Sequence, residues 1–132
     1  MKRRILIVTS NYYKFISEGL LNSAKEELQE PFDLISVPGV FEIPITIAKN
    51  IKKYDGFIAL GCVIKGETPH FDFISKATID GIMKLSVECK KPIGNGIITC
   101  LNQKQAEARI KKGQEAARAL SSVLNQIKVS TK

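Results

Sequence analysis

The feature that most constrains the fold is the regular alternation of short apolar runs with amphipathic stretches. Four apolar runs occur along the chain, at 5–8, 32–37, 56–64 and 94–100, and segments of helical period follow them. The run at 56–64 is the most apolar, as expected of a central strand buried on both faces. Strands that alternate with helices through short connections form parallel sheets covered on both faces. The sequence therefore predicts an α/β fold, a three-layer α/β/α sandwich with a four-stranded parallel sheet.

Four helical segments are predicted. They run from about Phe15 to Gln29, over 41–51, from about Pro69 to Glu88, and from Gln103 onward. Pro44 suits the first turn of the second segment, and Gly113 is expected to divide the last one into two pieces. The side chains expected to point inward recur at helical spacing: Ile16, Leu20, Ala24 and Leu28; Ile74, Ala77, Ile82, Leu85 and Cys89; and Leu120, Val123, Leu124 and Ile127.

Length and hydropathy limit the domain organisation and the location. The chain has 132 residues, 44% of them hydrophobic, without a linker, a repeat or a low-complexity segment, so one domain over 1–132 is predicted. No apolar tract reaches the roughly 18 residues that a membrane helix needs. The apolar run at 5–8 is too short for a signal peptide, and we expect a cytoplasmic protein.

Charge and cysteine content exclude further classes of function. The net charge is +7, but the basic residues are spread along the chain and no RNA-binding motif occurs. A solvated surface with one local phosphate pocket explains this charge as well as nucleic-acid binding would. Cys62, Cys89 and Cys100 are far apart and the chain has a single histidine, so no metal site is expected. All three are interpreted as reduced cysteines packed as small apolar groups.

Ligands of open parallel sheets bind beyond the carboxyl ends of the strands. That rule selects three loops, TSNYYK, VPGVFE and IKGETPH. In the last of these, Thr68 suits a helix N-cap, Pro69 the first helical position, and His70 the first turn. The free N–H groups of such a turn attract phosphate, and the helix dipole disfavours protonated imidazole. His70 is then expected to exchange protons near pH 7. The alternative is an ordinary helix start with a surface histidine.

The other candidate residues allow two readings each. Val40 and Phe41 are placed where a flat heterocycle would lie, with Glu42 for its polar edge, but they could equally form a hydrophobic staple and a helix-start carboxylate. An aromatic ring from the first loop could stack on a ligand or pack at the rim. Arg109 and Lys112, three apart, could clamp a phosphate or form a solvated face.

Four stretches together resemble the lumazine synthase family. They are VPGVFEIP, ALGCVIKGETPHFDFI, NGIITCLNQKQAEAR and KGQEAA, and the similarity is colinear from Ile5 to about Leu124. The resemblance implies a flavodoxin-like topology and an enzyme of riboflavin biosynthesis. That enzyme condenses 5-amino-6-(D-ribitylamino)pyrimidine-2,4-dione with 3,4-dihydroxy-2-butanone 4-phosphate to 6,7-dimethyl-8-ribityllumazine, releasing phosphate and water. It implies no metal and no organic cofactor.

The resemblance also assigns roles to individual positions. His70 matches the proposed proton shuttle, and Tyr12 matches an aromatic that stacks on the pyrimidine ring. The remaining pyrimidine-binding positions are Val40, Phe41, Glu42, Cys62, Val63, Ile64 and Asn95. The positions that bind the butanone phosphate are Glu67, Thr68, Arg109 and Lys112, of which Lys112 lies beyond a gap in the alignment.

The family builds its active sites between neighbouring subunits, and Asn95 is a position that the neighbour donates. The resemblance therefore implies a homo-oligomer. The segment after Arg109 is only IKKG, shorter than the kink of shell-forming members, which favours a pentamer and no capsid. Three other functions stay open: a non-catalytic flavin- or lumazine-binding pentamer, a nucleic-acid-binding domain, and an archaeal-type riboflavin synthase. The joint presence of His70 and Arg109 favours the synthase.

Overall fold

The computed structural model describes residues 3–66 and 69–130. Its elements are, in chain order, β1 (Ile5–Ser10), α1 (Lys14–Glu27), β2 (Phe32–Val37), the 3-10 turn η1 (Val40–Glu42), α2 (Ile43–Lys49), β3 (Gly56–Ile64), α3 (His70–Cys89), β4 (Ile93–Cys100), α4 (Gln103–Glu107) and α5 (Lys112–Leu124).

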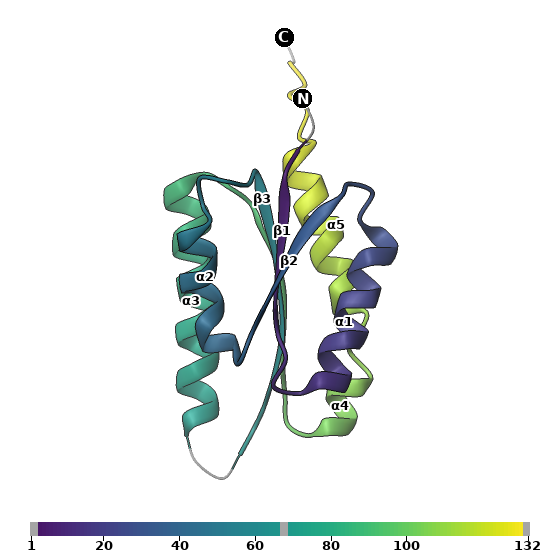
Figure 1. The fold of residues 1–132 in the computed structure, drawn as a ribbon, viewed down its shortest axis with the longest axis vertical. Helices are drawn as coiled ribbons and strands as arrows, with labels where there is room; N and C mark the ends of the chain where they lie inside the picture. The colour runs from purple at the N-terminus through teal and green to yellow at the C-terminus, as the bar shows by residue number, and fades with distance from the viewer. Residues whose placement is uncertain (1–2, 67–68, 131–132) are drawn as a thin grey trace.

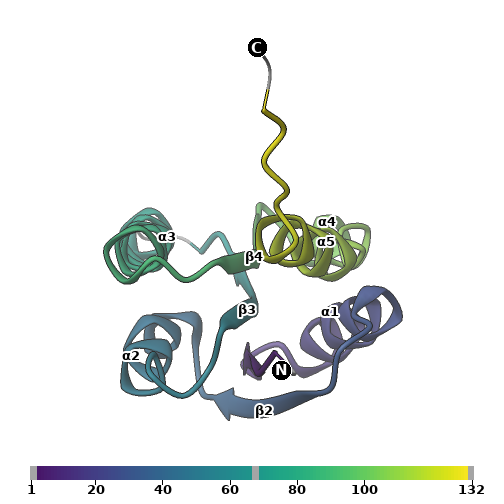
Figure 2. The same cartoon turned by 90° about the horizontal axis from the view of Figure 1, so that it is seen from above.

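The four strands form one sheet in the order β2-β1-β3-β4, and every neighbouring pair is parallel. Helices α2 and α3 cover one face of this sheet, and α1, α4 and α5 cover the other (Figures 1 and 2). This arrangement confirms the predicted three-layer α/β/α sandwich and its flavodoxin-like topology. None of the helices in the described ranges is long and apolar enough to cross a membrane.

Each face of the sheet has its own hydrophobic core, because successive side chains of a strand point to opposite faces. In β1, Ile5 and Ile7 pack under α1 and α5, whereas Leu6 and Val8 belong to the core under α2. The whole strand is at most 7% exposed, which explains why its sequence is a continuous apolar run. Burial of each large side chain stabilises the fold by roughly 1.5–3 kcal/mol.

Gly113 lies inside the first turn of α5 and not between two helices, so the prediction that it divides the segment is wrong. The division falls at residues 108–111, between α4 and α5. Gly113 is needed for a different reason: a Cβ there would lie 2.0 Å from the carbonyl oxygen of Leu20 in α1. The backbones of α1 and α5 therefore approach closely, and any side chain at this position would separate them.

The predicted inner faces of α3 and α5 are right in part. Leu120 is buried and Leu124 is half-buried, but Val123 is 45% exposed and Ile127, beyond the end of α5, is 86% exposed. Ala77 and Cys89 are exposed too, because the face of α3 that meets the sheet is centred on Thr78 and Ile82, both buried. All three cysteines are free, as predicted, but only Cys62 and Cys100 pack in a core.

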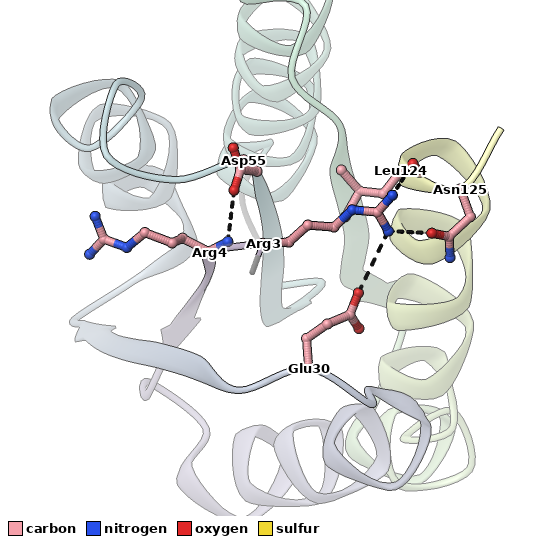
Figure 3. Close-up of polar contacts among 6 residues, drawn as sticks. All are labelled: Arg3, Arg4, Glu30, Asp55, Leu124 and Asn125. Atoms are coloured by element: carbon pink, nitrogen blue, oxygen red, sulfur yellow. Dashed lines mark hydrogen bonds and ion pairs between the residues drawn. The ribbon is translucent and has the colours of Figure 1, made fainter. Parts of the chain in front are cut away.

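A polar cluster stabilises the end of the sheet where the strands begin (Figure 3). The guanidinium of Arg3 donates to the carbonyl oxygen of Leu124 at 2.7 Å and to Oδ1 of Asn125, and it lies 3.9 Å from the carboxylate of Glu30. The backbone N–H of Arg4 donates to Oδ2 of Asp55 at 2.7 Å. These contacts tie α5 and the loop before β3 to the start of β1. The opposite end, where the strands finish, holds the loops that were predicted to bind ligands.

Candidate active site

A cavity of about 350 Å³ lies at the carboxyl ends of β1 and β3. Four segments meet there: the β1–α1 turn, η1 with the glycine before it, the end of β3, and the start of α3. The residues that line it are Tyr12, Tyr13, Gly39, Val40, Phe41, Cys62, Val63, Ile64, Gly66, His70, Phe71 and Ile74. The lining is mostly apolar with one imidazole, which suits a flat heterocyclic ligand.

The floor of the cavity depends on a close contact between β3 and η1. A Cβ at Gly61 would lie 2.5 Å from Cγ1 of Val40, so only glycine lets η1 approach the strand this closely. Val40 is consequently 5% exposed, while its neighbour Phe41 is left 57% exposed at the rim. The Pro-Gly turn after β2 thus buries one apolar side chain under the cavity and leaves the next one available for contact.

Two aromatic rings form one wall. Tyr12 is 73% exposed, and its ring lies edge-to-face against that of Tyr13, with 4.9 Å between the centroids. Tyr13 is half-buried against the core under α1, and burial raises the pKa of its phenol. The Tyr13 phenol is therefore uncharged at neutral pH, and its ring supports that of Tyr12. The first loop taken alone left open which of Tyr12 and Tyr13 would stack on a ligand, and the family resemblance named Tyr12.

His70 is the first residue of α3 and lines the cavity from an exposed position. The N-cap is Pro69 and not Thr68, so the helix begins one residue later than predicted. The carbonyl oxygen of Pro69 accepts from the N–H groups of Asp72 at 3.1 Å and Phe73 at 3.3 Å. His70 lies in the first helical turn, as predicted. Glu67 and Thr68, the expected phosphate-binding pair, lie outside the described residues.

Cys62 contributes backbone to the cavity, not a nucleophile. It is 4% exposed, and burial raises the pKa of its thiol to about 12, with the neighbouring Cys100 adding to this shift. A thiol with such a pKa stays protonated near pH 7, and the thiolate is the reactive form. Its burial and raised pKa therefore argue against a nucleophilic role for Cys62.

A second hollow, of about 400 Å³, lies between β4 and the segment that joins α4 to α5. It contains Arg109 and Lys112, whose cationic groups suit an anion such as phosphate. Nη1 of Arg109 donates to the carbonyl oxygen of Thr99 at 3.2 Å, and Nζ of Lys112 lies 3.9 Å from the Glu115 carboxylate. Lys111 also lines this hollow, although it was not among the predicted site residues. Its position in the sequence, close to Arg109 and Lys112, could have indicated that it belongs to the same site.

Among the described residues the two hollows have separate linings, with His70 in that of the cavity and Arg109 in that of the basic hollow. Asn95 lies in neither; it is exposed on β4, where its Oδ1 accepts from the N–H of Ile97. Glu42 is half-buried and lines a third, more apolar groove beside α3 instead of the cavity. The cavity thus unites seven of the predicted residues: Tyr12, Val40, Phe41, Cys62, Val63, Ile64 and His70.

Five further described residues of the cavity were not among the predicted site residues: Tyr13, Gly39, Gly66, Phe71 and Ile74. Ile74 could have been found from helical spacing, because it lies four residues after His70 in α3. Within the described ranges no group of three or more His, Cys, Asp and Glu side chains could hold a metal ion.

Comparison with known proteins shows which family the chain is similar to. The family model described as 6,7-dimethyl-8-ribityllumazine synthase matches residues 2–128. A protein of that name from Agrobacterium fabrum is 44% identical, and the alignment covers 89% of this chain and 90% of the relative. One from Afipia carboxidovorans is 44% identical over 88% and 80%, and 6,7-dimethyl-8-ribityllumazine synthase 1 of Rhodopseudomonas palustris is 43% identical over 92% and 83%.

Proposed function

The chain belongs to the 6,7-dimethyl-8-ribityllumazine synthase family, and from this premise we propose that it catalyses the lumazine-forming step of riboflavin biosynthesis. The substrates would be 5-amino-6-(D-ribitylamino)pyrimidine-2,4-dione and 3,4-dihydroxy-2-butanone 4-phosphate. The products would be 6,7-dimethyl-8-ribityllumazine, phosphate and water. We place this function in the cytoplasm and in one domain over 1–132.

The cavity supports a place for the pyrimidine. Tyr12, 73% exposed, offers a ring on which the heterocycle can stack, and Val40 and Phe41 add apolar lining to the same cavity. The backbone of Cys62, Val63 and Ile64 at the end of β3 offers N–H and C=O groups to the amide-like edge of the ring. Glu42 and Asn95 would complete the contacts to the ribityl chain and the ring.

The basic hollow supports a place for the second substrate. The planar guanidinium of Arg109 can bind phosphate bidentately, and Lys112 adds a second positive charge. Glu67 and Thr68, which match the family's phosphate-binding turn, would complete this subsite. His70 would lie between the two substrates, where it takes a proton as the imine forms and gives one as phosphate leaves.

Most of the rate would come from alignment of the two substrates. An amine and a ketone already react without help, so holding them in contact removes a large entropic barrier. Proton transfer by His70 would add a factor of about 10². The reaction forms and breaks C–N and C–O bonds without net electron transfer, so it needs no redox cofactor.

The observation that carries the proposal is the separation of the His70 cavity from the Arg109 hollow within one subunit. We infer that a second copy completes the site, and we propose a homopentamer with sites between neighbours. Large apolar side chains exposed on η1, α2 and α3 support the proposal that a neighbouring subunit covers this surface. They are Phe41, Ile45, Phe73, Met83 and Val87, each at least 57% exposed.

The test is a complementation assay. Chains with His70→Ala and chains with Arg109→Ala are prepared separately, refolded together in equal amounts, and given both substrates while lumazine absorbance is followed. If neighbours share each site, random assembly restores about a quarter of wild-type activity. Activity that stays at the level of the two separate variants would show that the residues act within one chain. Wild-type protein that forms no lumazine but retains it would identify the non-catalytic alternative.

We also infer that the positive charges behind the net charge of +7 include those that bind the anionic substrate, and that the protein does not bind nucleic acid. The cations at 109–112 gather at one hollow, and the remaining basic residues lie at scattered positions in the sequence. A gel shift with generic RNA at low salt is expected to show no complex; a salt-sensitive complex there would contradict this reading.

A further inference from the structure

A hollow of about 530 Å³ lies at the end of the sheet where the strands begin, opposite the cavity. The segment before β1, the loop before β3, the start of β4 and the end of α5 meet there (Figures 1 and 3). We call it the amino-end hollow. None of its described lining residues also lines the cavity or the basic hollow. Its volume lies in the range of small-molecule sites.

Cations from distant parts of the sequence line the amino-end hollow: Arg3, Lys90 and Lys91. The carboxylate in the same lining is Asp55, whose Oδ2 already accepts from the N–H of Arg4 at 2.7 Å. Glu30 lies 3.9 Å from the Arg3 guanidinium and offsets part of its charge. Three cations against two carboxylates leave positive charge in excess, so the hollow attracts an anion.

Two of these cations are held in place by the fold. The Arg3 guanidinium donates to the carbonyl oxygen of Leu124 at 2.7 Å and to Oδ1 of Asn125 (Figure 3). Nζ of Lys91 donates to the carbonyl oxygen of Ile51 at 2.5 Å. Because a guanidinium has five N–H donors and an ammonium three, both groups keep donors for a ligand. Side chains that are already ordered lose little entropy when they bind it.

The third cation, Lys90, has a backbone conformation that favours glycine. It ends α3 with φ of 57° and ψ of 40°, in the left-handed region. Glycine adopts this conformation at a helix end without steric strain, whereas a residue with a Cβ is strained there. Strain of this kind is frequent at ligand sites. The lysine places an exposed ammonium at the hollow at a cost in stability.

Part of the lining is apolar and comes from Pro92, Val123 and Leu124. Val123 is 45% exposed, so it is available for contact with a ligand. Cations beside apolar carbon atoms suit an anion that carries an organic group. A guanidinium together with ammonium groups is typical of phosphate sites.

We propose that the amino-end hollow binds an organic phosphate of nucleotide size. The phosphate lies on the three cations, and the organic group lies against Pro92, Val123 and Leu124. This site goes beyond the proposed function and does not depend on it, because the residues proposed for lumazine formation line other hollows. A bound phosphate links the start of β1, the end of α3 and the end of α5, and it stabilises the folded subunit.

The test is calorimetric titration of the full chain with ADP as the probe, with residue-resolved NMR to locate the site. ADP is expected to shift the amide signals of Lys91, Val123 and Gln126. The same shifts are expected in Arg109→Ala, which weakens the basic hollow as an alternative site. Adenosine lacks the phosphates and should bind at least about tenfold more weakly, because charge-assisted hydrogen bonds are lost. Pyrophosphate lacks the organic group and should also bind more weakly.

Substitutions separate the hollow from general surface charge. Lys90→Gly should raise Kd for ADP about tenfold without lowering Tm, since glycine relieves the backbone strain. The control Lys84→Ala removes an exposed cation of α3 outside the hollow and should change Kd less than twofold. Val123→Glu adds a carboxylate to the hollow and should abolish binding, whereas Val123→Gln, of the same size and uncharged, should retain most of it.

Amide shifts confined to the cavity and the basic hollow would overturn the proposal. So would an equal Kd for ADP in the wild type and Lys90→Gly. Adenosine that binds as tightly as ADP would refute the role of the cations, and pyrophosphate that binds as tightly would refute the role of the apolar lining. Lys90→Gly should form lumazine at the wild-type rate. A wild-type chain that forms no lumazine while ADP still shifts Val123 would refute the proposed function alone.

Discussion

Substitution of Gly113 by alanine tests whether the close approach of α1 and α5 is a requirement of the fold. A Cβ at this position would lie 2.0 Å from the carbonyl oxygen of Leu20, 2.9 Å from its carbonyl carbon and 3.1 Å from the backbone nitrogen of Ala24. All three atoms belong to the main chain of α1, so no side-chain rotation relieves the overlap. The two helices must move apart, and this movement loosens the packing of the core that they share.

The magnitude follows from two opposing effects. Over-packing of a well-packed interior costs about 1–3 kcal/mol, and a clash with main chain belongs at the upper end of that range. Alanine recovers about 0.8–1 kcal/mol of helix propensity over glycine. The net loss in the free energy of unfolding is therefore about 2 kcal/mol. For a chain of this length that loss lowers Tm by roughly 6–10 °C.

The assay is thermal unfolding followed by circular dichroism, with urea unfolding to check that the m-value is unchanged. Gly19→Ala is the matched control on α1, since its Cβ would meet only the side chain of Ile110, just before α5, at 3.0 Å. Its Tm should stay within about 3 °C of wild type, since side-chain adjustment and gained helix propensity offset each other. A Gly113→Ala protein that melts at or above the wild-type temperature would refute the reasoning.

The remaining predictions concern the site. Arg109→Ala should raise KM for the butanone phosphate at least about tenfold in steady-state kinetics, because a bidentate phosphate contact is lost. The control Arg118→Ala removes only a surface pair with Glu27 at 3.0 Å and should leave this KM unchanged. Equal effects of the two substitutions would argue against phosphate binding by Arg109. His70→Ala should lower kcat by about 10²-fold while leaving turnover above the uncatalysed rate; an unchanged kcat would exclude proton transfer by this residue. The buried Cys62 thiol has a pKa raised from 9.0 to about 12. Between these two pH values the thiol loses its proton only in the unfolded chain, so the free energy of unfolding falls as pH rises above 9. Melting curves at about pH 8 and pH 10 should show a smaller drop for Cys62→Ala, and an equal drop would contradict the shift.

The fold class follows from the sequence because it rests on local periodicity. A continuous apolar run such as 56–64 and a segment with apolar residues every fourth position each specify their own conformation. The predicted boundaries of β2 and β3 agree with the structure to the residue. Parallel pairing then follows, since the connections are long enough to hold a helix and too long for a hairpin. Seven of the predicted site residues also lie together in one cavity, because the carboxyl ends of parallel strands share one edge.

The wrong predictions concern residues whose surroundings are set by a distant part of the chain. Gly113 looks like a helix break, but its role is set by the Leu20 carbonyl on another helix. Val123 continues an apolar spacing, yet it is exposed because the face of α5 that meets β3 carries Leu120 and Leu124 instead. The side chain of Cys89 is exposed because the contact face of α3 follows Thr78 and Ile82. Local pattern carries no information about such contacts.

The sequence by itself determined the order of strands and helices, the loops that carry chemistry, and the family. Only the tertiary structure decided that His70 and Arg109 lie in separate hollows of one subunit. The physical reason is that side-chain periodicity is a property of neighbours along the chain, whereas the relative placement of the start of α3 and the segment before α5 depends on how the layers pack. We therefore expect a second copy to complete the proposed site.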